Sequence, residues 1–299
     1  MALIKGILAK EGKGVEKNAN DGKSAFMLFL ELYGRKLWKT IQVGLIYLIV
    51  ALPTLAVWWL CSGLISNHVV NLAGPVLAQI VENADIALSY TAIVDFFVRA
   101  FIALLFMSLW GVGPVSAGFT YIMRNYAREE YAWPWSDFLE HTKKNFFQAL
   151  CVWVIDVIVF VLLIFSFLFY STESGSMSLL KYVIAFVFLT YTTMHFYIYQ
   201  LMITFKLKIK DIFKNAFLLA IVALPANMLV FVLTIVFHGI FPYLGLNFSF
   251  FGGSMGFWTI YILFALLILQ GLSGFMINFV ANRTIKKYML DRLGVKEEN

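Results

Sequence analysis

The sequence predicts an all-α integral membrane protein with six transmembrane helices. Residues 215–282 form a run of 68 residues without Asp, Glu, Lys or Arg, and crossing a bilayer core of roughly 30 Å takes about 20 apolar helical residues. Hydrophobic residues make up 61% of the chain and charged residues 13%, against about 25% charged residues in soluble domains. Strands of a membrane barrel would alternate over about ten residues, whereas these apolar runs are continuous.

The charge-free run divides into two spans joined by a loop rich in Gly, Phe, Pro and Asn. The same criterion applied upstream gives four more spans. The expected spans are residues 40–65, 100–123, 146–169, 182–204, 216–237 and 257–280. We therefore expect an N-terminal amphipathic segment over 1–39, one membrane domain over 40–280 and a basic tail over 281–299.

The positions of Lys and Arg predict the orientation. Of the 23 such residues, 21 lie in alternate segments that would share one side with both ends of the chain, and 2 lie in the other segments. Because basic loops stay in the cytoplasm, both termini are expected to be cytoplasmic. The net charge of +6 is then a topology signal with some attraction to anionic lipid headgroups, and it indicates no nucleic-acid partner.

Three of the expected cytoplasmic entries into the membrane resemble one another. Residues 35–39, 143–147 and 210–215 each combine cations with an aromatic residue. The resemblance predicts three related two-helix hairpins. The alternative is that any inward-facing boundary collects Lys, Trp and Phe.

The loop over residues 124–145 is expected to contain a short amphipathic helix lying along the membrane face. Pro134 stands where such a helix would begin, and apolar residues follow at helical spacing. Such a helix can simply anchor the loop in the interface, or it can dock a cytoplasmic partner. The candidate docking residues are Trp133, Trp135, Asp137, Phe138, Leu139, Glu140, Lys144 and Asn145, with Phe138 and Leu139 as the apolar anchors.

A resemblance begins at this loop. Residues 113–118, 121–128, 135–138 and 144–146 resemble the YesL family of bacterial six-span membrane proteins, a domain of unknown function, and residues 208–218 are similar to that family's second cytoplasmic loop. The resemblance implies a bacterial plasma-membrane protein associated with carbohydrate uptake systems. It implies no enzymatic activity.

Asp156 and His195 are the intramembrane polar candidates. Asp156 is expected near the middle of the bilayer, where an ionised Asp costs roughly 2.5–3.5 kcal/mol. It is expected to face the helix bundle and to be neutral, paired or lining water. His195 is the residue nearby in type that could share a proton with it, and the sequence leaves open whether the two meet.

Small residues form two stripes, from Gly111 to Gly118 in the second expected span and from Gly271 to Gly274 in the sixth. Helix packing is the favoured interpretation of both. Pro53, Pro114 and Pro225 are expected to kink three spans and free backbone carbonyls.

The sequence contains no phosphate-binding loop, zinc motif or nucleophile elbow, so we expect no cofactor, no metal site and no enzyme. The function that we infer is a non-ATPase membrane subunit or accessory of a bacterial carbohydrate uptake system. Its expected partners are membrane lipids, proteins of a transport complex and a carbohydrate substrate. The rival interpretation is a membrane scaffold or regulator that transports nothing, and an intramembrane enzyme using Asp156 and His195 ranks last.

Overall fold

The computed structural model describes residues 23–80, 84–247 and 254–290. The structure is all-helical, and the described residues include no strand. The longer helices are α2 (Ala25–Ile80), α3 (Ala84–Leu109), α6 (Phe146–Thr172), α7 (Leu180–Thr204), α9 (Leu224–Asn247) and α11 (Gln270–Ile285). Shorter helices are α4 (Pro114–Ala127), α5 (Ser136–Lys144), α8 (Ile209–Val222) and α10 (Ser254–Phe264). A 3-10 turn, η1 (Gly175–Leu179), precedes α7, and π-helical turns η2 (Ala265–Leu269) and η3 (Lys286–Leu290) flank α11.

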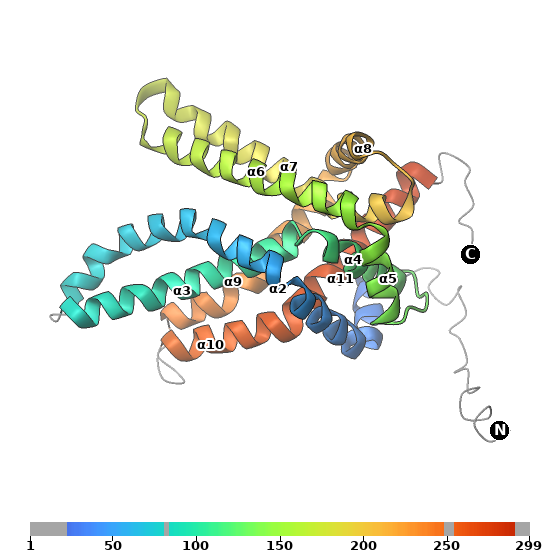
Figure 1. Cartoon of the computed structure of the whole chain (residues 1–299), viewed down its shortest axis with the longest axis horizontal. Helices are drawn as coiled ribbons and strands as arrows, with labels where there is room; N and C mark the ends of the chain where they lie inside the picture. The colour runs from blue at the N-terminus through green and yellow to red at the C-terminus, as the bar shows by residue number, and fades with distance from the viewer. Residues whose placement is uncertain (1–22, 81–83, 248–253, 291–299) are drawn as a thin grey trace, which may run out of the picture.

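Three helix hairpins extend in one direction, α2 with α3, α6 with α7 and α9 with α10 (Figure 1). Helices α4, α5 and α8 gather at the opposite end of the molecule, where the first turns of α2 and the end of α11 also lie. The hairpin arrangement thus agrees with the sequence pattern, while a common ancestry of the three hairpins stays a prediction. Of the expected N-terminal segment 1–39, residues 25–39 are the first part of α2 and residues 1–22 lie outside the described residues.

Several helices are long and apolar enough to cross a membrane. Among the described residues five helical stretches qualify: Ala25–His68, Thr91–Leu109, Phe146–Thr172, Gly175–Thr204 and Thr259–Leu290. A sixth is obtained if α8 and α9, which meet at an angle of 91°, count as one broken span. The outward faces of α6 and α7 expose large apolar side chains, for example Phe165 (57% exposed) and Phe186 (66%), as expected of helices that contact lipid tails.

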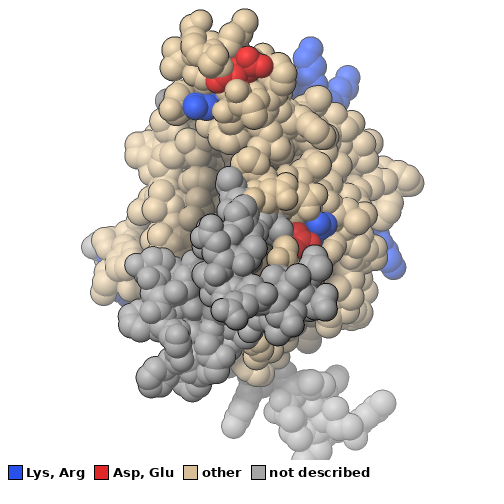
Figure 2. Space-filling model, turned by 90° about the vertical axis from the view of Figure 1, so that its left-hand side faces the viewer, with Lys and Arg blue, Asp and Glu red and all other residues tan. Residues whose placement is uncertain are grey.

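The end of the molecule where the hairpins turn carries few charged side chains among the residues coloured in Figure 2. In α3, Arg99 Nε lies 2.7 Å from Asp95 Oδ2, so these two opposite charges form an ion pair. This sparsity parallels the uneven distribution of Lys and Arg in the sequence.

The expected second span, residues 100–123, is not one helix. Helix α3 ends at Leu109, and α4 begins at Pro114. Gly111 and Gly113 between them have φ values of 81° and 76°, a left-handed conformation that disfavours residues with a Cβ atom. Pro114 is the first residue of α4, a position where its missing N–H removes no helical hydrogen bond.

The expected fifth span, residues 216–237, is also divided, because α8 ends at Val222 and α9 begins at Leu224. Pro225 stands at this elbow, and a proline donates no backbone hydrogen bond to the preceding turn. The Asn227 amide instead donates to the Ala220 carbonyl at 3.0 Å, and Tyr197 donates to Asn227 Oδ1 at 2.7 Å. Pro225 therefore accompanies a break, as does Pro114, whereas Pro53 lies inside the uninterrupted α2.

Glycines allow the close helix contacts that the small-residue stripes predict. A Cβ atom at Gly271 would lie 2.6 Å from the Thr40 carbonyl oxygen, and one at Gly44 would lie 3.1 Å from the Gly271 nitrogen. Helices α2 and α11 thus cross backbone to backbone. Gly118 similarly lies against the Phe138 backbone of α5, and Gly274 against the ring of Phe119. The predicted packing role is confirmed for Gly118, Gly271 and Gly274. Gly111 and Gly113 instead lie in the break between α3 and α4.

We predict that Gly271→Ala lowers the stability of the folded protein by about 1–3 kcal/mol, because the added methyl group forces α2 away from α11. Gly34→Ala is the matched control, since nothing lies within 4 Å of the added methyl group on that exposed turn of α2. Thermal unfolding of both variants in the same detergent tests the prediction. Equal melting temperatures for the two variants would contradict the close crossing.

Candidate functional site

The break between α3 and α4 is the centre of the buried polar structure. Its backbone groups are satisfied by side chains from two helices. The Ser116 hydroxyl accepts a hydrogen bond from the Val112 N–H at 2.7 Å, and the Trp58 indole donates to the Gly111 carbonyl at 2.9 Å. Tyr47 Oη lies 2.8 Å from Ser116 Oγ, so α2 supplies two of the three side chains that hold the break.

Asp156 and His195, which the sequence singled out separately, meet next to this break. His195 Nε2 of α7 lies 3.0 Å from Asp156 Oδ1 of α6, and both side chains are fully buried. Tyr191, one helical turn before His195, donates its hydroxyl to the same Oδ1 at 2.7 Å. The Nε2 contact lacks the alignment of a hydrogen bond, and Asp156 Oδ2 and His195 Nδ1 have no hydrogen-bond partner in the described protein.

Trp110 links the pair to the break. Its indole stacks on the His195 imidazole with ring centroids 5.2 Å apart and planes 1° apart, and its Nε1–H donates to Thr192 Oγ1 at 2.9 Å. Sequence reasoning missed Trp110 and Tyr191 as members of this site. Tyr191 could have been predicted, because its i, i+4 spacing from His195 places both side chains on one helix face.

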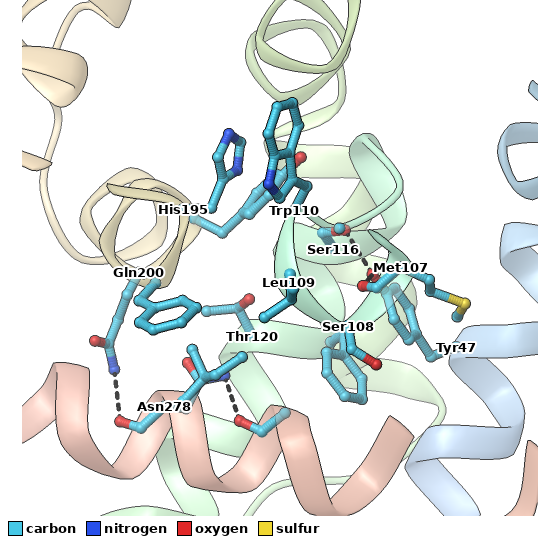
Figure 3. Close-up of a pocket in the computed structure, with 16 residues that line it drawn as sticks. Tyr47, Met107, Ser108, Leu109, Trp110, Ser116, Thr120, His195, Gln200 and Asn278 are labelled. Atoms are coloured by element: carbon cyan, nitrogen blue, oxygen red, sulfur yellow. Dashed lines mark hydrogen bonds between the residues drawn. The ribbon is translucent and has the colours of Figure 1, made fainter. Parts of the chain in front are cut away.

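A small polar cavity lies between the break, α7 and α11 (Figure 3). His195 and Trp110 lie in the upper part of the view, and Gln200 and Asn278 lie below them. Gln200 Nε2 donates to the Asn278 carbonyl at 3.4 Å, while Gln200 Oε1, Asn278 Oδ1 and the Tyr199 hydroxyl have no partner in the described protein. Such a concentration of unpaired polar atoms favours bound water.

The cavity measures about 40 Å³. At about 10–15 Å³ of such space per water molecule, about three waters fit. Sites for larger organic ligands typically measure about 300–1,000 Å³, so the cavity as it stands does not hold a sugar. Water in this cavity would contact His195, which in turn contacts Asp156.

The Asp156–His195 pair can hold a proton without net charge. With one shared proton the pair is neutral, whether the proton resides on the carboxyl or on the imidazole, and a neutral pair avoids the cost of an isolated buried charge. The arrangement thus suits proton holding and helix packing. The described residues contain no group of three or more His, Cys, Asp or Glu that could bind a metal.

A second buried polar cluster escaped sequence reasoning. Ser108 Oγ lies 3.0 Å from Gln270 Oε1 and 3.2 Å from His238 Nε2, and the Gln270 amide donates to the Leu104 carbonyl at 3.1 Å. These contacts tie α3, α9 and α11 together. His238 was assigned by sequence to a loop, but it lies within α9 with its Nδ1 2.9 Å from the Thr234 carbonyl oxygen.

The short helix expected after residue 134 is α5, and it packs against α4. Phe138, the expected apolar anchor for a partner, is fully buried against the bundle, because the backbone of α5 approaches α4 at Gly118. That expectation was wrong for Phe138, and Leu139 is also partly covered by the core. His141 stacks on Tyr121 with ring centroids 3.4 Å apart, and burial lowers the pKa of its imidazole.

The other docking candidates lie at the surface or stabilise the loop. Trp133 and Trp135 are 61% and 56% exposed, and Glu140 and Lys144 are exposed. Asp137 Oδ2 accepts the Trp133 N–H at 2.8 Å, and the Asn145 amide donates to the His141 carbonyl at 2.9 Å. The loop is therefore an ordered support that presents two tryptophans.

These features define an all-helical protein whose several long apolar helices are compatible with a membrane protein, with a buried polar pair beside a broken helix. Residues 54–167 match a family model described as a protein of unknown function, DUF624, a domain that YesL-like proteins carry. The matched residues contain the α3–α4 break, α5 and Asp156, whereas His195 lies beyond them. The searches of curated proteins and of solved structures gave no match.

We predict that Asp156→Asn yields folded protein, because an amide retains the shape of the carboxyl and still accepts the Tyr191 hydroxyl, whereas Asp156→Lys prevents assembly. Ile155→Lys is the matched control, since Ile155 is 37% exposed and a Lys there can extend along the lipid face to the interface. The fraction of monodisperse protein after detergent extraction measures the outcome. If the Asn variant aggregates as extensively as the Lys variant, Asp156 is instead an ionised partner whose charge is required.

Proposed function

We propose that this chain is a non-ATPase membrane subunit or accessory of a bacterial carbohydrate uptake system, and that it binds a cytoplasmic partner through the α5 region. One observation carries the partner-binding part. Trp133 and Trp135 are exposed on a loop that is itself fixed by the buried Phe138. Exposed tryptophans on an ordered support suit an interface, because buried Trp anchors carry much of the binding energy of protein complexes.

The size of the central cavity supports an accessory role over a conduit. At about 40 Å³ it is far below the volume of a typical ligand site. The carbohydrate part of the proposal rests on the resemblance to YesL-like proteins alone. The buried Asp156–His195 pair then serves helix packing, and we propose no catalytic role for it.

The proposal includes six spans, a plasma-membrane location and cytoplasmic termini. The uneven distribution of Lys and Arg in the sequence supports this orientation. It is also supported by the position of α4, α5 and α8 together at the end of the molecule opposite the hairpin turns (Figure 1).

Single cysteine probes test this orientation. In a chain with Cys61 and Cys151 replaced, we predict that an impermeant thiol reagent labels Ser174→Cys in intact cells and leaves Lys208→Cys unlabelled. Both positions are exposed, and they lie at opposite ends of α7. Permeabilised cells, in which both positions should react, provide the control. Labelling of position 208 in intact cells would refute the orientation.

We predict that the double substitution Trp133→Ala and Trp135→Ala lowers co-purification of carbohydrate-uptake subunits from native membranes by at least about 10-fold, because loss of two interface anchors typically costs more than this. The matched control is Phe165→Ala with Phe186→Ala, which removes two similarly exposed aromatics from the expected lipid face. Mass spectrometry of the captured complex and cellular oligosaccharide uptake are measured together.

The rival function, a scaffold or regulator that transports nothing, is favoured by the same small cavity. The two functions differ in the uptake measurement. Loss of both the partner and oligosaccharide uptake in the tryptophan variant supports the accessory role. Retention of full uptake in cells that lack the chain entirely would refute that role and favour the scaffold.

A further inference from the structure

An open groove of about 750 Å³ lies at the elbow between α8 and α9. One wall consists of elbow residues, among them Val222, Pro225 and Ala226, and the other is the end of α11 with η3. The elbow exists because the α8–α9 path turns by 91°. The groove is therefore a direct product of the helix break at Ala223.

The α11 wall is strongly basic. Arg283, Lys286 and Lys287 line the groove and are exposed, and the described residues that line it include no Asp or Glu. The spacing of three and four residues places these cations on one helix face. The Arg283 guanidinium lies over the Phe279 ring, 5.6 Å from its centroid, and the Lys287 ammonium lies over the Tyr288 ring, 5.1 Å from its centroid. No ion pair between described residues involves any of the three cations.

The two helix dipoles at the elbow largely offset each other. The C-terminus of α8 carries partial negative charge and the N-terminus of α9 partial positive charge, and the two ends are separated only by Ala223. The attraction for an anion therefore comes from the three side chains. Arg and Lys together favour a phosphate, since guanidinium groups bind it through two donors and ammonium groups act as point charges.

The elbow wall continues as an apolar strip. Leu229, Val232 and Val236 on α9 are 61%, 52% and 49% exposed, and their spacing of three and four residues keeps them on one face. Val222 and Leu224 at the elbow are 50% and 46% exposed. A ligand with a phosphate and an apolar tail fits this combination better than a soluble phosphate does.

We propose that the groove is a binding site for an anionic phospholipid, with the phosphate between Arg283, Lys286 and Lys287 and an acyl chain along α9. Basic pockets between membrane helices on the cytoplasmic side bind such headgroups. The site lies on that side in the orientation proposed above, and it is independent of the proposed uptake function.

The test uses full-length purified protein in mild detergent and native mass spectrometry, with phosphatidylglycerol, phosphatidylcholine or glycerol phosphate added. The pocket variant combines Arg283→Gln, Lys286→Gln and Lys287→Gln. The matched control combines Lys206→Gln, Lys208→Gln and Lys210→Gln, which removes three exposed cations outside the groove. Size-exclusion chromatography verifies that both variants remain folded.

We expect saturable binding of phosphatidylglycerol over phosphatidylcholine. The pocket variant should bind it on the order of 100-fold more weakly, because each cation near an anionic lipid contributes about a factor of five. The control variant should bind like the unsubstituted protein. Equal losses in both variants would overturn the site in favour of general surface charge, and binding of glycerol phosphate without lipid preference would overturn the lipid as its ligand.

Discussion

The structure depends on one constraint, that backbone polar groups inside an apolar bundle must find partners within the protein because lipid supplies none. Both helix breaks obey it. At residues 110–113 the freed groups are bound by Ser116 and Trp58, and at the α8–α9 elbow the Ala220 carbonyl is bound by Asn227. An unpaired buried group costs about 1–3 kcal/mol, so each of these side chains has a clear structural role.

The first break also places Trp110 against the Asp156–His195 pair. Because α3 stops at Leu109, Trp110 is free to turn its indole onto His195. The stacked indole and the small cavity beside Ser116 therefore both lie at the Gly-Val-Gly-Pro sequence at 111–114.

Much of the fold could be predicted from the sequence, because membrane crossing is governed by local hydropathy and charge. A kink at Pro114 was expected, but the full break at 110–113 was missed, because Gly111 and Gly113 were grouped with Ser116 and Gly118 as a packing stripe. The contact between Asp156 and His195 depends on how α6 and α7 rotate about their axes, which two isolated apolar helices do not specify. Phe138 shows a related limit, because an apolar helix face does not reveal whether it covers its own bundle or a partner.

Helix α4 lies between the central cavity and α5. Ser116 and Thr120 face the cavity, while Gly118 lies against the backbone of α5 at Phe138. These residues lie within five positions of one 14-residue helix, and α5 follows it with the exposed Trp133 and Trp135 in the connection. Packed protein interiors are nearly incompressible and transmit strain, so a displacement of α4 at the cavity would be passed on to α5. Any change in the cavity that shifts α4 would therefore reach the tryptophans directly, without involving the hairpin ends on the other side of the bundle.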